Sequence, residues 1–261
     1  MKKIINLCLF VASIYSTNAQ STAFEKTDEK FDNNEFVWQV KFNDIKIGEF
    51  WPVHGIEFLP KGHTDYNVKS ELPVLQKKLR AIAIVPGSMT GNIASTNYYF
   101  IEGKSISKGN PCSSDGIVHD CGIIVVDEIE KISFRHAQEF QNFDSLYSKV
   151  KESKNTLFFL PSMYRNGNYL SSNAMIDKVL IRRTVPDGEQ IGVIIFDKLT
   201  TYDQVREIVL GLDRDNRSKT THIYVLDGGP IWGQCLKHVN DKNVVIGTRD
   251  VNVITNYLIL Y

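Results

Sequence analysis

The sequence lacks an excess of charge of either sign and has few cysteines and histidines. Its 261 residues include 30 lysines and arginines against 30 aspartates and glutamates, with 4 cysteines and 6 histidines. Balanced charge argues against a surface that binds the phosphate backbone, so we expect no nucleic-acid partner. Walker and Gly-x-Gly-x-x-Gly loops are absent, as are His-Glu-x-x-His and Gly-x-Ser-x-Gly. These absences argue against nucleotide binding, zinc hydrolases and serine hydrolases.

A long apolar run occurs only at the N-terminus. Lys2 and Lys3 precede the apolar residues 4–12, and a small, polar stretch ends at Ala19. This order is typical of a secretory signal peptide, and the run is shorter than the roughly 20 residues of a transmembrane helix. A buried N-terminal element would not explain the lysine pair. We therefore expect residues 1–19 to be removed and the protein to be exported to the periplasm, the cell surface or the medium.

The rest of the chain shows no linker, repeat or second long apolar run. Residues 20–34 are polar and aperiodic, which predicts a flexible lead-in. Residues 35–261 fit one globular domain with no transmembrane segment.

Two of the remaining cysteines are close in sequence. Cys112 and Cys121 flank a polar loop, and export to an oxidising compartment favours a local disulfide between them. The alternative is three separate core thiols, with Cys235 as the third. No Cys-x-x-Cys spacing supports a zinc site.

Short apolar runs between turn signals predict a chain rich in strands. The predicted strands cover 36–42, 81–85, 98–101, 122–126, 129–134 and 156–160. Helices are predicted at 145–154 and at 201–212, where Thr201 and Gln204 have capping-box spacing.

The second helix lies between strand-like runs at 190–196 and 221–226. Strand, helix and strand in this order predict a β-α-β crossover with parallel strands. The expected fold is therefore α+β, a mixed sheet with flanking helices. Ligands gather at the carboxyl ends of strands in such sheets, which directs attention to residues 226–230.

Two short patterns carry the chemistry of a candidate site. Asp227 follows a strand and can serve as an acid, a base or a metal ligand, while Gly228 and Gly229 let a ligand approach the backbone. The alternative is a plain Asp-Gly turn. Arg182 and Arg183 suit phosphate binding and should face opposite sides of a strand. The alternative interpretation is that the two arginines lie at the solvated end of a strand and bind no ligand.

Six segments in order resemble the phosphodiester glycosidase family over about residues 80–235. They are VPGSMTGN at 85–92, YFIEGK at 99–104, CGIIVV at 121–126, LPSMYRNG at 160–167, IRRT at 181–184 and LDGG at 226–229. The family's early Gly-Gly-Phe-Phe-Asn pattern is not recognisable here. Pro230 and Ile231 stand where the family continues with glycine and serine.

The resemblance implies an exported hydrolase that cleaves a sugar phosphodiester, with a carbohydrate or sugar-phosphate ligand. Asp227 would be the acid/base or metal-organising carboxylate, and Arg183 or Arg182 would hold the phosphate. No cofactor is certain, and a divalent cation (Ca²⁺, Mg²⁺ or Mn²⁺) is left open. The other expected substrate-binding residues are Gly228, Gly229, Ser162, Thr184 and Asn92.

A second hypothesis keeps the fold without the activity. Loss of the serine and the third glycine after Gly229 removes a hydroxyl and backbone freedom beside Asp227. The protein would then be a catalytically impaired glycan-binding envelope protein. A third interpretation is a structural envelope protein without a small ligand.

Overall fold

The structure, a computed structural model, describes most of the chain from Phe24 to Tyr261. The described residues are 24–60, 71–87, 99–101, 104–107, 121–126, 132–136, 156–165, 168–169, 175–215, 217–226, 235–246 and 256–261.

Strands dominate this part of the chain. The strands are β1 (Phe24–Lys30), β2 (Phe36–Phe42), β3 (Ile45–Val53), β4 (Ile56–Pro60), β5 (Ala83–Pro86), β6 (Tyr99–Ile101), β7 (Lys104–Ser107), β8 (Cys121–Val126), β9 (Ile132–His136), β10 (Thr156–Arg165), β11 (Asn168–Tyr169), β12 (Met175–Val185), β13 (Gly188–Thr201), β14 (Lys219–Val225), β15 (Cys235–Val239), β16 (Lys242–Ile246) and β17 (Asn256–Leu260). The described helices are α1 (Glu71–Leu79) and α3 (Tyr202–Asp215).

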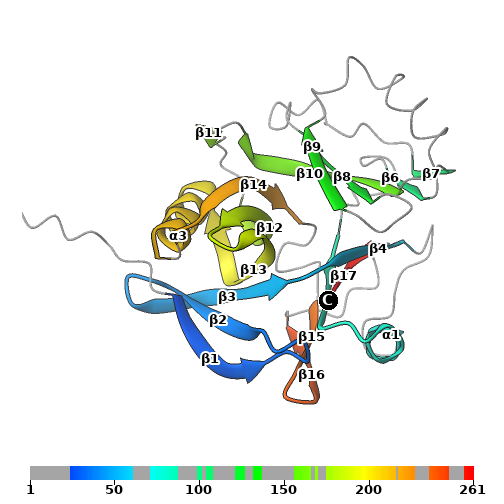
Figure 1. The fold of residues 1–261 in the computed structure, drawn as a ribbon, viewed down its shortest axis with the longest axis horizontal. Coiled ribbons are helices and arrows are strands. Elements are labelled where there is room, and N and C mark those ends of the chain that lie inside the picture. The colour runs from blue at the N-terminus through cyan, green and yellow to red at the C-terminus, as the bar shows by residue number, and fades with distance from the viewer. Residues whose placement is uncertain are drawn as a thin grey trace, which may run out of the picture.

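The strands form two sheets (Figure 1). The larger has 12 strands, and its main path runs β1-β2-β3-β13-β12-β14-β10-β6-β7, with β8, β9 and β11 attached beside β10. The smaller has 5 strands in the order β16-β15-β5-β17-β4. The long hairpin of β12 and β13 therefore lies in the middle of the larger sheet.

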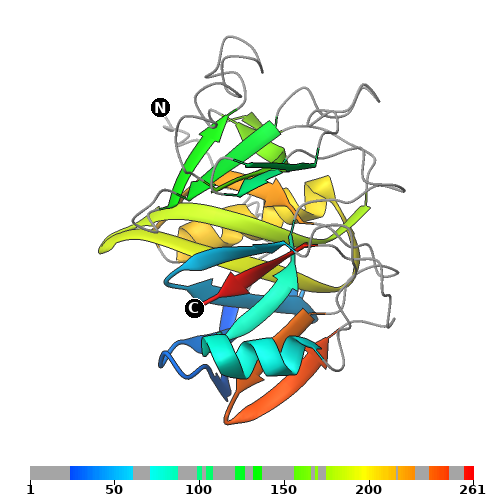
Figure 2. The same ribbon diagram turned by 90° about the vertical axis from the view of Figure 1, so that its right-hand side faces the viewer.

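The two sheets pack face to face, with a helix on each outer face (Figure 2). Trp51, Leu180 and Tyr224 of the larger sheet meet Cys235 and Leu258 of the smaller one in a shared core. A second core lies between the larger sheet and α3, and a third between the smaller sheet and α1.

Alternation along the strands produces these layers. Leu180 faces the smaller sheet, whereas its neighbours Val179 and Ile181 face α3. Leu258 and Ile259 divide in the same way between the shared core and α1. Successive side chains of a strand point to opposite faces, so a strand covered on both sides is apolar throughout.

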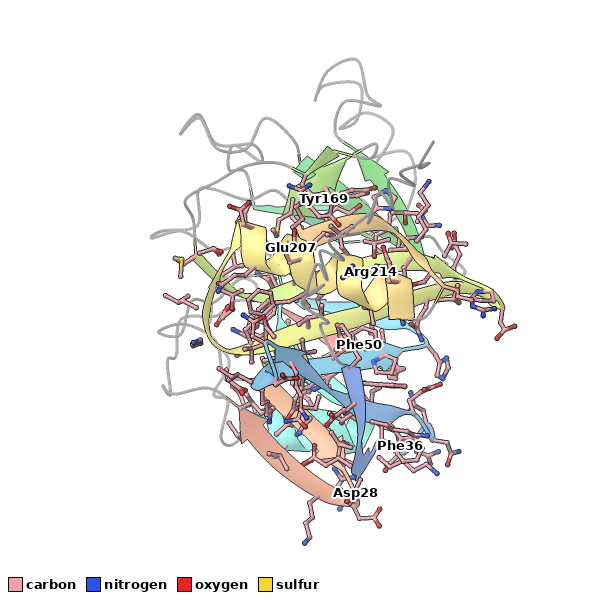
Figure 3. All side chains as sticks on the ribbon, turned by 90° about the vertical axis from the view of Figure 1, so that its left-hand side faces the viewer. Asp28, Phe36, Phe50, Tyr169, Glu207 and Arg214 are labelled. Carbon is pink, nitrogen blue, oxygen red and sulfur yellow. The ribbon has the colours of Figure 1, made fainter. Side chains whose placement is uncertain are left out.

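Helix α3 begins as the sequence predicts. The Thr201 N–H donates to Gln204 Oε1 at 3.1 Å, and the Gln204 N–H donates to Thr201 Oγ1 at 3.2 Å. This reciprocal capping box satisfies two amides that the first helical turn leaves without partners. In Figure 3, α3 lies across the larger sheet between Tyr169 and Phe50.

The prediction of an α+β fold on a mixed sheet with a β-α-β crossover is wrong. Every strand pairing in the described residues is antiparallel. The strands flanking α3, β13 and β14, are not neighbours, because β12 lies between them and pairs with both. The β12–β13 hairpin precedes α3 in the chain, and β12 occupies the position beside β13 that a parallel neighbour would take.

Other predictions have mixed outcomes. The strand at 36–42 is confirmed as β2, while part of the expected flexible lead-in, Phe24–Lys30, is strand β1. The helix predicted at 145–154 lies outside the described residues. None of the described helices is both long enough and apolar enough to cross a membrane.

Candidate functional site

The carboxyl end of β14 is held between two neighbouring strands. The Leu226 N–H donates to the Lys178 carbonyl of β12 at 3.3 Å, and on the other side Tyr224 pairs with Ser162 of β10. Leu226 is 2% exposed. The position directly before Asp227 is therefore fixed in the core between the sheets.

A buried charge pair lies beside this end. Lys178 Nζ donates to Asp177 Oδ2 at 2.7 Å, and their side chains are 3% and 11% exposed. Burial raises the pKa of the Asp177 carboxyl, although the charge of Lys178 and its hydrogen bond oppose that shift. Removing two charges from water costs several kcal/mol per ion, so the pair is weak evidence for stability and suggests a chemical use.

The smaller sheet contributes Cys235 to the same region. Burial raises the pKa of the Cys235 thiol to about 12, with Lys178 lowering it and Asp177 raising it. A thiol with so high a pKa stays protonated at neutral pH and is a poor nucleophile. Cys235 is thus a small apolar side chain of the core that also contains Leu226. The chain leaves this region at Leu226 and re-enters it at Cys235; residues 227–234 lie outside the described residues.

Arg183 lies at the opposite end of β14. It pairs with Thr220, six residues before Leu226, which at about 3.3 Å per residue is roughly 20 Å away. The guanidinium donates from Nε to Gln190 Oε1 at 2.8 Å and from Nη1 to Ser218 Oγ at 3.4 Å. Burial lowers the pKa of Arg183 to about 10, opposed by the charge of Asp213. These contacts tie β12, β13 and the start of β14 together.

Arg182 and Thr184 share that distant end. Arg182 lies over the Phe134 ring at 5.2 Å and forms an ion pair with Glu189. Thr184 is exposed and pairs with Lys219. As predicted, the two arginines face opposite sides of the strand, with Arg183 over Phe50 on the α3 side. The structure does not bring either arginine to the end of β14.

Ser162 does lie near the end of β14. Its side chain donates to the Tyr164 carbonyl at 3.0 Å, and the residue is 3% exposed. The hydroxyl thus supports the irregular register between β10 and β14. The remaining predicted site residues, Asp227, Gly228, Gly229 and Asn92, lie outside the described residues, as does Cys112 of the predicted Cys112–Cys121 disulfide.

Sequence reasoning missed Asp177 and Lys178. The signal was present: two opposite charges interrupt the otherwise apolar run from Met175 to Ile181. A charged pair inside a strand that is buried on both faces is uncommon, because such strands are normally near-continuous in apolar residues.

No known protein family matches this sequence, and no curated protein matches it in sequence. Among solved structures, the fold is shared with a glycosidase that acts on a phosphodiester. That structure is the catalytic domain of zebrafish N-acetylglucosamine-1-phosphodiester alpha-N-acetylglucosaminidase, auto-inhibited by its pro-peptide. The TM-score is 0.51 at 13% identity, over 95% of this chain and 85% of that one. The predicted resemblance is thus matched at the level of a related fold, and family membership stays a prediction.

Proposed function

We propose that the protein is an exported hydrolase that cleaves the bond between a sugar and a phosphodiester. One observation carries the proposal: a buried lysine–aspartate pair adjoins the residue that precedes Asp227-Gly228-Gly229. The shared fold with a phosphodiester glycosidase supports the same class of substrate. The N-terminal pattern of residues 1–19 supports export.

In this proposal Lys178, and not an arginine, supplies the cation for the phosphate. Lysine binds phosphate as a point charge, and Lys178 lies beside the end of β14, where Arg183 does not. Binding requires Lys178 to exchange its partner Asp177 for the phosphate. The raised pKa of Asp177 favours this exchange, because it lowers the cost of protonating the carboxyl that Lys178 leaves.

Asp227 is the proposed general acid/base. Water adds to the anomeric carbon, the carbon–oxygen bond to phosphate breaks, and the proton of the water passes to the carboxylate of Asp227. Phosphate leaves with the electron pair of that bond, so its developing charge calls for a nearby cation. Backbone N–H groups at Gly228 and Gly229 would offer further donors, and a divalent cation is left open.

The test compares two lysines that are equally buried. Lys178 and Lys237 are both 3% exposed at their side chains and paired with carboxylates, but Lys237 bonds Glu29 and Glu49. Hydrolysis of a panel of chromogenic sugar phosphodiesters is measured for Lys178→Met and Lys237→Met, each checked for folding by circular dichroism. The proposal expects loss of turnover only in the Lys178 variant. Equal loss in both would make Lys178 a structural residue.

A catalytically impaired glycan-binding protein is the second candidate. Pro230 and Ile231 favour it, since they replace a glycine and a serine after Gly229 in the pattern that the sequence resembles. This protein would bind sugars without turnover. Calorimetric titration with the same panel separates the candidates, because binding without product excludes the hydrolase.

A further inference from the structure

Three potential metal ligands meet where the two sheets adjoin at their edges. Asp32, His238 and Asp241 each offer one ligand atom, and these atoms lie within 4.8 Å of one another. Asp32 follows β1, His238 belongs to β15, and Asp241 lies in the turn between β15 and β16. The group therefore joins the two sheets, at the other end of β15 from Cys235.

The backbone around these residues is fixed by contacts that do not involve the ligand atoms. Phe31 forms a bridge with Val239, and the Asn240 N–H donates to the Lys30 carbonyl at 3.0 Å. The Lys30 N–H in turn donates to Asn240 Oδ1 at 3.2 Å. Asn240 and Asp241 have φ values of 50° and 61°, as in the tight turn of a two-residue hairpin.

The imidazole of His238 is oriented for coordination. Its Nδ1 lies 2.8 Å from Asn243 Oδ1, so the tautomer with the proton on Nδ1 donates a hydrogen bond to that oxygen. Nε2 is then the atom with a lone pair, and it lies 3.6 Å from Asp32 Oδ2. A metal-bound histidine is typically held in this way through its other ring nitrogen.

We infer that Asp32, His238 and Asp241 bind a first-row divalent cation such as Zn²⁺. This cation would join the β1–β2 hairpin to the β15–β16 hairpin. Zinc ligands at about 2.0–2.2 Å from the metal place neighbouring donor atoms roughly 3.3 Å apart. The separation of His238 Nε2 and Asp32 Oδ2 already approaches that value. The exposed carboxylate of Asp241 lies within 4.8 Å of both of these atoms and would supply the third ligand. One nitrogen and two oxygens favour Zn²⁺ over Mg²⁺ or Ca²⁺, which take oxygen ligands.

The test is calorimetric titration of the chelator-treated full chain with Zn²⁺ and, separately, Mg²⁺. The inference expects a saturable Zn²⁺ site and no comparable Mg²⁺ site. His238→Gln and Asp241→Asn should each weaken Zn²⁺ at least tenfold, and Asn243→Ala roughly tenfold through the second ring nitrogen. His54→Gln is the matched control, because His54 has one carboxylate neighbour, Glu35 at 3.4 Å, and lies outside the group.

Melting temperatures supply an independent readout. Zn²⁺ should raise the melting temperature of the wild type and of His54→Gln relative to the metal-free form of each. The rise should be lost in His238→Gln, whatever that substitution does to the metal-free protein. An adventitious surface ion only, shown by equal Zn²⁺ affinity in His238→Gln and the wild type, would overturn the inference, as would the absence of saturable binding.

Discussion

Lys178 and Asp177, neighbours in β12, form a 2.7 Å ion pair that is almost wholly removed from solvent. Consecutive strand residues normally point to opposite faces, but the pairing of β12 with β13 shifts register between Ile176 and Lys178. The irregularity lets both side chains turn toward each other. It lies opposite Leu226, so a local distortion of the central hairpin creates the charged feature beside the candidate site.

Replacing one member of this pair should destabilise the protein more than replacing both. Lys178→Met leaves the Asp177 carboxyl buried without its cation, which should lower the free energy of unfolding by about 3–5 kcal/mol. The double variant Asp177→Asn, Lys178→Met removes both charges and should be more stable than the single variant. Urea unfolding at pH 7 measures both. Additive costs of the two single substitutions would show that the charges do not interact.

The ion pair of Lys237, the second buried lysine, with Glu49 predicts that the stability of the protein depends on pH. Burial alone would raise the pKa of Glu49, but the hydrogen bond and charge of Lys237, with a hydrogen bond from Trp51, hold it below 4.5. A lowered pKa means that Glu49 contributes stability above about pH 4.5, and that this is lost as pH falls through its folded value. Glu49→Gln should therefore be less stable at pH 7 and lose less on acidification. Urea midpoints at pH 7, 5 and 3 test this; parallel curves for the two proteins would contradict it.

Arg183 should matter for stability and not for turnover. Arg183→Met removes the donors to Gln190 and Ser218 and should cost about 2–3 kcal/mol of unfolding free energy. Since Arg183 lies far from Leu226, kcat/KM of any sugar phosphodiester turned over should be unchanged. A folded variant that has lost its turnover would instead restore the arginine as the phosphate ligand.

Two glycines test the packing of the central strands. A Cβ on Gly48 would lie 2.2 Å from the Ile195 carbonyl oxygen, whereas one on Gly55 would meet nothing closer than 3.9 Å. Gly48→Ala must therefore push β3 away from β13 and should cost at least about 1–3 kcal/mol. Gly55→Ala is the matched control and should be nearly neutral. Melting temperatures test both expectations, because a loss of 1 kcal/mol lowers the melting temperature of a chain of this size by about 2–4 °C.

Local patterns predicted the elements better than their arrangement. Alternation gave β2, and the spacing of Thr201 and Gln204 gave the start of α3. The sheet order could not be inferred in this way, because β12 is placed between β13 and β14 by pairings that no local pattern encodes. Strand β1 was missed because its polar residues are held by edge pairing with β2.

The strand beside the candidate site was predicted from the sequence, whereas the roles of Asp227, Gly228 and Gly229 stay a prediction. The end of a strand before Asp227 was identified from the sequence, and Leu226 is indeed buried there. Arg183 was grouped with it because both belong to the same resemblance, yet antiparallel pairing puts them at opposite ends of β14. Lys178 was missed, since a charge within an apolar strand has no motif of its own.

The most direct test is hydrolysis of the chromogenic sugar phosphodiester panel by protein recovered from expression of the full chain. It is run with and without Ca²⁺, Mg²⁺ or Mn²⁺, alongside Asp227→Asn, Lys178→Met and the control Lys237→Met. The account predicts turnover by the wild type and by Lys237→Met, and none by the other two variants while they remain folded. Undiminished turnover in a folded Asp227→Asn, or no turnover by folded wild type on any substrate, would contradict it.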